Sequence, residues 1–123
     1  MGEGGVRPIK SFRNEIAVQT HPKDKTVPCE IYRDLEVPTG KKTSLKVKAS
    51  YHAHGDWQIR VKADGKVIHD QIVGYTAVQS QWLELNLDLS DYAGKKIPIV
   101  IENRANDWRN EFGYWGSIEV VSK

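Results

Sequence analysis

The stretch WQIRVKADGKVIHDQIV, residues Trp57–Val73, decides the fold class. Its first half, Trp57–Ala63, alternates apolar and polar side chains, as in a β-strand that is buried on one face. Asp64-Gly65 follows, and both residues tolerate positive φ, so the pair predicts a type I′ turn. Lys66–Val73 is then expected to return as the second strand of a hairpin.

The same period of two recurs in six further stretches, so the sequence predicts eight strands in all. Ser90 is expected to cap a single helical turn that stops at Gly94. Pro98 has no N–H group to donate, so its strand is expected to lie at a sheet edge or to be irregular. The six further strands are Glu15–Thr20, Cys29–Val37, Thr43–Tyr51, Trp82–Leu89, Ile97–Ile101 and Tyr114–Val121.

Recurring turn signals and the absence of a long helical period favour an all-β fold. We predict an eight-stranded antiparallel β-sandwich, a jelly roll. An immunoglobulin-like sandwich is the alternative, although the sequence lacks the Cys…Trp…Cys spacing of that fold. Residues 1–14 are expected to form an N-terminal tail or lead-in segment, and residues 15–123 a single domain.

Size and charge narrow the class of protein. The chain has 123 residues, the size of one ordinary domain, and a net charge of +2. This balance argues against nucleic acid as a partner, because nucleic-acid binders usually carry a basic excess. No apolar run approaches the roughly 18 residues of a membrane helix and no signal-peptide pattern opens the chain, so we expect no membrane insertion. Cys29 is the single cysteine, which excludes an internal disulfide and a cysteine-rich zinc site.

The aromatic residues are the less ordinary feature. The chain has four tryptophans and five tyrosines but only two phenylalanines. Most of its aromatic side chains therefore carry a polar group, which suits partly hydrated surfaces. Trp57 is in phase with apolar neighbours and is expected mainly in the core. Trp82 and Trp115 are out of phase with their neighbours and are expected to face outward. Trp108 lies in a polar loop, where it either pins the loop down or presents its ring to a ligand.

The loop around Trp108 also contains Asn106, Asp107 and Arg109. An aromatic ring can pack against the apolar face of a pyranose, while amide, carboxylate and guanidinium groups bond the sugar hydroxyls. The same residue types are common at the centres of protein–protein interfaces. The composition of the loop therefore leaves a sugar and a protein partner open.

Signals for catalysis and for metal binding are weak. A glycosidase needs two carboxylates across a cleft, and Asp107 with Glu111 is the only acid pair of this loop. Hydrolase elbows, phosphate loops and dinucleotide fingerprints are absent, so we predict no catalytic residues and no enzyme activity. His52, His54 and Asp56 could ligate zinc, but we interpret them as incidental to a polar loop. We predict no cofactor and name no metal ligand, while oxygen atoms in the loops leave a structural calcium ion open.

Basic residues occupy alternate, outward-facing positions on two predicted strands. Lys46 and Lys48 lie on one predicted strand, Arg60 and Lys62 on the next, and Lys66 follows the turn. If these strands pair, they form a basic sheet face. We interpret it as a solvated face that resists edge-to-edge aggregation. Attraction to an acidic glycan is the alternative.

Several segments resemble galactose-binding-domain-like β-sandwich modules, of the kind appended to secreted bacterial polysaccharide-active enzymes. In that family a Leu-Asp-Leu-Ser turn is followed by a loop with Asn and Trp, and then by a Tyr-Trp-Gly segment that opens the last strand. The resemblance extends over about Cys29–Val121. The segments that carry it are Val37–Thr43, Gly55–Trp57, Leu87–Lys95, Asn106–Trp108 and Tyr114–Gly116.

The resemblance implies a non-catalytic carbohydrate-binding module that recognises a polysaccharide or oligosaccharide through loops at one end of the sandwich. It also implies a secreted or periplasmic location and, in some members, other domains in the same chain. The alternative is a protein-interaction or structural spacer module of a larger secreted protein, without sugar binding. The predicted ligand-binding residues are Trp108, Arg109, Asn106, Asp107, Trp115, Trp57, His52 and His54.

Overall fold

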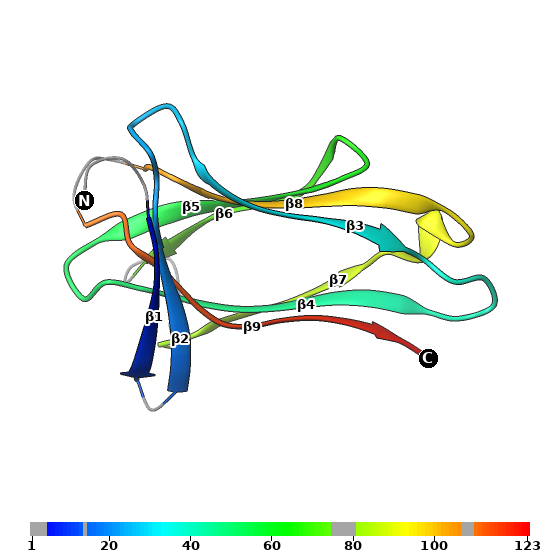
Figure 1. Cartoon of the computed structure of the whole chain (residues 1–123), viewed down its shortest axis with the longest axis horizontal. Helices are drawn as coiled ribbons and strands as arrows, with labels where there is room; N and C mark the ends of the chain where they lie inside the picture. The colour runs from blue at the N-terminus through cyan, green and yellow to red at the C-terminus, as the bar shows by residue number, and fades with distance from the viewer. Residues whose placement is uncertain (1–4, 14, 75–80, 107–109) are drawn as a thin grey trace.

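The computed structural model describes residues 5–13, 15–74, 81–106 and 110–123 (Figure 1). Nine strands and one short 3-10 helix lie within these residues. They are β1 (Gly5–Phe12), β2 (Glu15–His21), β3 (Cys29–Glu36), β4 (Thr43–Tyr51), β5 (Asp56–Ala63), β6 (Lys66–Gly74), β7 (Leu83–Asp88), η1 (Ser90–Tyr92), β8 (Lys96–Arg104) and β9 (Gly113–Ser122). In this described part of the chain, no helix is long and apolar enough to cross a membrane.

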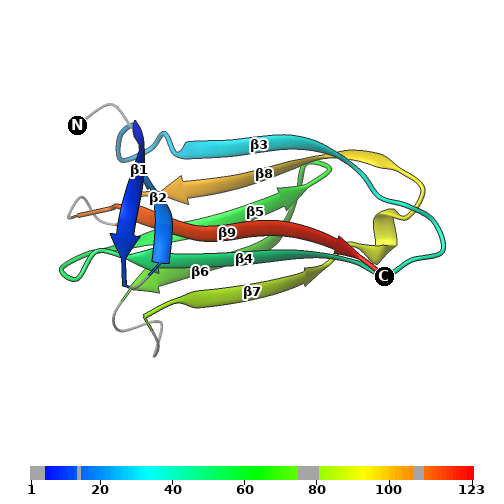
Figure 2. The same ribbon diagram turned by 60° about the horizontal axis from the view of Figure 1, so that its bottom comes forward.

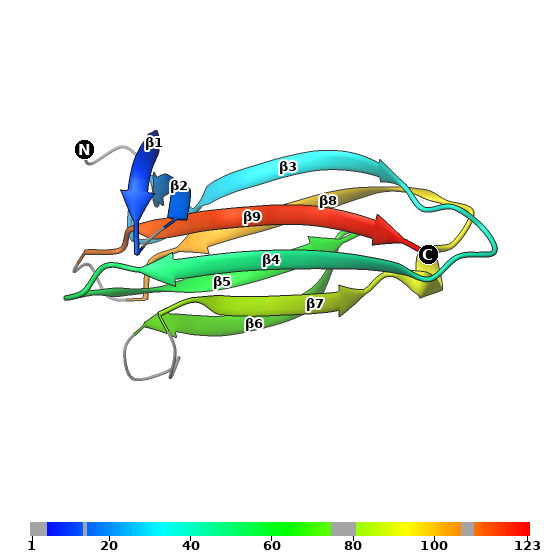
Figure 3. The same ribbon diagram turned by 90° about the horizontal axis from the view of Figure 1, so that it is seen from below.

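The strands form two sheets that pack face to face (Figures 1 and 3). One sheet has five strands in the order β1-β2-β9-β4-β7, and the other has four in the order β3-β8-β5-β6. All strand pairs are antiparallel. The β1–β2 hairpin pairs with β9 only at Gly113–Trp115 and lies at a steep angle to the other strands of the sheet (Figures 1 and 2). The predicted all-β antiparallel sandwich with jelly-roll architecture is confirmed.

β1 is a strand that the sequence did not predict. Residues Gly5–Phe12, expected to belong to a tail or lead-in segment, pair with β2 from Gly5 opposite His21 to Phe12 opposite Glu15. β1 lies at a sheet edge, where Pro8 is tolerated because an edge strand needs hydrogen bonds on one side only. The proline and a register shift between Ile9 and Phe12 interrupt the alternation that would have marked a strand.

The core lies between the inward faces of β4, β5 and β8. In β5 every second residue is buried, which is the phase that its sequence predicted. Trp57 is 0% exposed, and its Nε1 donates to the Ser50 carbonyl oxygen at 2.9 Å. The aliphatic core residues from these strands include Leu45, Val47, Ile59, Val61, Ile97, Ile99 and Ile101.

The turn after β5 has the predicted geometry. Asp64 and Gly65 have φ values of 53° and 78°, and a type I′ turn requires positive φ at both positions. Pro98, expected in an edge or irregular strand, lies instead in β8, between β3 and β5. β5 ends at Ala63, and the Asp64 N–H then donates to the Pro98 carbonyl oxygen at 3.0 Å. This side of Pro98 therefore faces a turn, where its missing N–H breaks no ladder hydrogen bond.

The helical turn after β7 also forms, with a different start. Leu89 is the N-cap of η1 and makes no side-chain cap bond, so the prediction of Ser90 as N-cap is wrong. The Asp88 carboxylate instead accepts the Ser90 N–H at 2.9 Å. Gly94 ends the turn at φ 83°, and its N–H donates to the Val37 carbonyl oxygen at 2.7 Å. The turn is thereby tied to the chain that leaves β3.

A bulge in β9 reverses the phase expected for Trp115. Lys48 of β4 pairs with Ser117 and Ala49 pairs with Trp115, so Gly116 is an extra residue between them. One extra residue turns the following side chains to the opposite face of the sheet. Trp115 therefore faces the core and is only 4% exposed, contrary to the expectation that it faces outward.

The predicted basic face does not form. β4 and β5 belong to different sheets, so Lys46 and Lys48 lie on one outer face of the sandwich and Arg60 and Lys62 on the other. Arg60 and Lys62 each form an ion pair with an acidic side chain on a neighbouring strand. Neither outer face therefore collects the positive charge of both strands.

Candidate functional site

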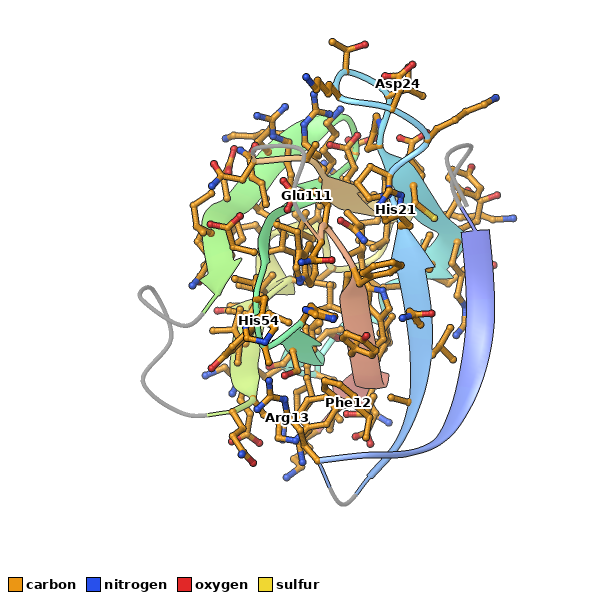
Figure 4. The ribbon with its side chains drawn as sticks, turned by 90° about the vertical axis from the view of Figure 1, so that its left-hand side faces the viewer. Phe12, Arg13, His21, Asp24, His54 and Glu111 are labelled. Carbon is orange, nitrogen blue, oxygen red and sulfur yellow. The ribbon has the colours of Figure 1, made fainter. Side chains whose placement is uncertain are left out.

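The β2–β3, β4–β5 and β8–β9 connections lie at one end of the sandwich, away from the C-terminus (Figure 1). Figure 4 looks onto this end, where His21 at the end of β2, His54 and Glu111 lie on different segments. The described loop residues among the predicted ligand contacts, His52, His54 and Asn106, lie on the β4–β5 and β8–β9 connections at this end.

The β4–β5 loop, residues 52–55, is a tight turn that orients two histidines. The His54 N–H donates to His52 Nδ1 at 3.0 Å, and the Gly55 N–H donates to the His52 carbonyl oxygen at 3.0 Å. Because Nδ1 accepts a hydrogen bond, this geometry requires a neutral His52 imidazole. Burial lowers the pKa of His52 below its ordinary value, and electrostatic interactions with His54 and Arg13 lower it further. The folded loop favours the uncharged ring.

The β8–β9 loop is fixed by Glu111. This side chain is 1% exposed, and its Oε1 accepts the Asn106 N–H at 2.8 Å. Two further hydrogen bonds join this loop to the β4–β5 region: Asn106 Nδ2 donates to Asp56 Oδ2 at 3.0 Å, and Asn110 Nδ2 donates to the His54 carbonyl oxygen at 3.3 Å. The two loops are therefore held beside one another.

A buried polar cluster supports the β8–β9 loop from inside the sandwich. Asn103 Nδ2 donates to Thr20 Oγ1 at 2.9 Å and to the Glu111 carbonyl oxygen at 3.3 Å. Trp115 Nε1 donates to the same Thr20 oxygen at 2.8 Å. A Cβ atom at Gly113 would lie 2.9 Å from Asn103 Nδ2, so the cluster has no room for a larger residue there. The loop thus rests on β2, β8 and β9 together.

The structure brings three predicted ligand-binding residues to this end. His52 is half-buried, whereas His54 and Asn106 are exposed. The hydrogen bonds of the two loops keep these side chains in one region of the surface. The other predicted loop residues, Asp107, Trp108 and Arg109, lie outside the residues that the structure describes.

Trp57 and Trp115, also predicted to bind ligand, lie in the core. Their exposed fractions are 0% and 4%, and their ring centroids are 5.1 Å apart. The Ser50 carbonyl and the Thr20 hydroxyl accept their indole N–H groups. Neither ring presents a face on which a sugar could stack, so both residues leave the candidate site.

The geometry assigns Glu111 a structural role. Its carboxylate is buried and bonds to the loop backbone, which is not the solvent-facing position that the acid pair with Asp107 would need. Asp56 likewise bonds to Asn106 and not to the histidines. Across the ranges that the structure describes, no group of three His, Cys, Asp or Glu side chains could hold a metal ion.

A polar groove of about 640 Å³, which the sequence did not predict, lies on the outer face of the five-stranded sheet. Figure 3 is viewed onto this face of the sheet. Trp82 lies beside it, with Lys48 Nζ 5.3 Å from the ring centroid and Phe12 packed edge-on at 6.0 Å. The outward phase of Trp82 was the signal for this surface. The polar side chains of the groove are Lys46, Lys48, Glu84, Asn86, Ser117 and Glu119.

Neither the protein-family models nor the curated proteins compared with this sequence match it. Solved structures do match the fold. The EclA C-terminal domain, a sugar-binding protein, aligns with a TM-score of 0.65 and 16% identity over 90% of this chain and 81% of that one. A family 35 carbohydrate-binding module from Clostridium thermocellum aligns with a TM-score of 0.60 and 13% identity over 98% and 89%.

A third structure is the CBM22-1 xylan-binding domain of Paenibacillus barcinonensis Xyn10C, with a TM-score of 0.59 and 12% identity over 99% of this chain and 83% of that one. The chain has the fold of a carbohydrate-binding module. On this fold, the two polar surfaces described above are the paired β4–β5 and β8–β9 loops at one end and the groove on the outer face of the five-stranded sheet.

Proposed function

We propose that this chain is a non-catalytic carbohydrate-binding module whose glycan site is formed by the β4–β5 and β8–β9 loops. The observation that carries the proposal is the pair of hydrogen bonds from Asn106 to Asp56 and from Asn110 to His54. These bonds hold the exposed Asn106 amide and the exposed His54 imidazole in one region of the surface. Asn106 and Asn110 lie on either side of Trp108 in the sequence. The likeness of the fold to sugar-binding structures supports the proposal.

In this proposal Trp108 stacks on the apolar face of a sugar ring. Asn106, Asp107 and Arg109 bond its hydroxyls, with His52 and His54 at the margin. The affinity is weak, because a shallow sugar site exchanges many hydrogen bonds with water for a small net gain. The proposal includes a secreted or periplasmic setting and other domains in the same chain, which the family resemblance implies.

A glycan array that includes acidic polysaccharides tests the function, with titration of any hit and an assay for sugar products. We expect binding without products. Trp108→Ala should abolish binding while leaving the thermal midpoint almost unchanged. Asn106→Ala should also abolish binding, with a small fall in the thermal midpoint because it removes the bond to Asp56. Trp82→Ala is the matched control, because it removes a tryptophan from the sheet face and should leave loop binding intact.

Other results would redirect the assignment. Binding that survives Trp108→Ala but is lost in Trp82→Ala would move the site to the sheet-face groove. Unfolding of Trp108→Ala would make Trp108 an anchor of the loop. Products would make the chain a small lyase or hydrolase. Absence of binding to every glycan on the array would favour a protein-interaction or spacer module.

A further inference from the structure

No strand of the described residues closes the side of the sandwich between β3 and β9. β2 pairs with β9 only at Gly113–Trp115. From Gly116 to Ser122, β4 is the only partner of β9 in the described part of the chain. β3 is the outermost strand of the other sheet. Ile31 of β3 and Ile118 and Val120 of β9, near these two strand edges, are therefore partly open to solvent.

A hollow of about 260 Å³ lies between these two strand edges. Ile118 and Val120 of β9 are 38% and 37% exposed, although they lie next to the buried Val47 and Leu45 of β4. Exposed apolar surface of this kind marks a place where a ligand or partner removes water from the protein. The aliphatic walls are formed by Ile31, Leu35, Leu45, Ile99, Ile118 and Val120.

Arg33 adds a charge to this apolar hollow. It lines the hollow from β3 and occupies a position in phase with Ile31 and Leu35, so it stands where an inward-facing apolar residue is expected. It forms no ion pair with any residue that the structure describes. A charge at such a position of an edge strand opposes the addition of another strand. It also offers a guanidinium group to an anion that reaches the hollow.

We propose that this hollow binds an amphiphile with a short alkyl chain and an anionic head group. The alkyl chain of this ligand fills the space between the sheets, against Ile118 and Val120, and its head group pairs with Arg33. The volume of about 260 Å³ holds roughly nine heavy atoms if each takes the ~30 Å³ of a water molecule in the liquid. The charge of Arg33 selects this ligand over a second copy of the chain, because docking a strand here would bury that charge without a partner. The site is separate from the proposed glycan loops.

Sodium octanoate, titrated below its micelle concentration, is the probe, with 1-octanol as the uncharged match. Calorimetry should show octanoate binding at least tenfold more tightly than octanol. Arg33→Gln should weaken octanoate binding roughly tenfold and leave octanol binding unchanged. Val120→Phe should fill the hollow and abolish binding of both probes, and Lys66→Gln, at the distant β5–β6 turn, should change neither.

Methyl NMR spectra locate the probe without relying on a variant. Octanoate should shift the Ile118 and Val120 methyl signals and leave the loop-end signals in place. The proposal is overturned if octanoate and octanol bind equally, if Arg33→Gln leaves octanoate binding unchanged, or if the shifts lie elsewhere. It is also overturned if the protein is a dimer that Val120→Phe dissociates, because a second copy then occupies this side.

Discussion

Replacing Trp57 by phenylalanine distinguishes a core tryptophan from one that contacts sugar. Trp57 is fully buried, donates through Nε1 to the Ser50 carbonyl oxygen at 2.9 Å, and packs 5.1 Å from the Trp115 ring. Phenylalanine keeps an aromatic face and removes the N–H group and part of the ring volume. The substitution should therefore reduce stability and leave the loop surface unchanged.

Two losses set the size of the effect. The Ser50 carbonyl loses a buried donor, which costs about 2 kcal/mol. The smaller ring leaves a space that the neighbours only partly refill, which costs about 1 kcal/mol more. Domains of this size unfold with a free energy of roughly 6–18 kcal/mol, from about 0.05–0.15 kcal/mol per residue. A loss of about 3 kcal/mol should lower the thermal midpoint by roughly 12 °C, at about 4 °C per kcal/mol.

Urea denaturation followed by far-UV circular dichroism measures the loss. This signal is preferable to fluorescence, because the chain has four tryptophans and the substitution removes one of them. The slope of unfolding free energy against urea should stay constant, so that the change in midpoint reports stability alone. Trp82→Phe is the matched control and should cost less than half as much, because Trp82 is only half-buried.

Glycan binding gives the second readout. Trp57→Phe should bind every glycan that the parent binds, at temperatures where both proteins are folded. If Trp57→Phe unfolds at the parent's urea midpoint and has lost glycan binding, the core assignment is refuted and the ring belongs to a ligand site.

Three further predictions concern the loop end. Glu111→Ala removes the acceptor of the Asn106 N–H at 2.8 Å and should lower the unfolding free energy by about 2 kcal/mol in a urea titration. Glu111→Gln keeps an acceptor oxygen and should lose less. Equal urea midpoints for both variants and the unsubstituted protein would show that Glu111 does not anchor the loop. Burial lowers the pKa of His52 below its ordinary value of 6.5, so the unfolded chain binds this proton more readily than the folded protein. The contribution of His52 to stability should be full above about pH 6.5 and decline below it, and a thermal-midpoint series against pH should flatten in this range for His52→Gln. Gly113→Ala places a Cβ atom 3.1 Å from the Trp57 ring and should lower the unfolding free energy by about 1–3 kcal/mol. A urea midpoint equal to that of the unsubstituted protein would show instead that the backbone shifts to make room.

The strands that could be predicted are those that keep one face in the core and the other in water along their whole length. β5 does so, and its residues alternate between buried and half-buried from Asp56 to Ala63. β9 does not, because the extra residue Gly116 changes its phase after Trp115. A pattern with a fixed period cannot locate a bulge, and this is why the burial of Trp115 was missed.

The pairing of distant strands was the second obstacle. The outward phases of Lys48 and Arg60 are local properties and could be predicted, but the sheet to which each strand belongs could not. The same holds for the sheet-face groove, where Trp82 packs against Gly116 of another strand. Nothing in the neighbouring sequence of either residue specifies that contact.

The candidate site shows the same division between local and distant information. Residue type indicated that Asn106 and His54 were suited to a polar loop site. The support beneath the loop depends on the bond from Asn103 to Thr20, which are 83 residues apart in the chain, and no local pattern announces it. The roles of Asn103, Thr20 and the buried Glu111 could be recognised only in the folded chain.

The anchoring of the β8–β9 loop has a consequence for how such a protein diversifies. The described bonds that fix the loop come from Asn106, Asn110 and Glu111, on either side of positions 107–109. Substitution of positions 107–109 under selection for a new ligand would therefore leave these three described anchors of the loop unchanged. A combinatorial library confined to these three positions would vary proposed ligand contacts while keeping the bonds of Asn106, Asn110 and Glu111 in place.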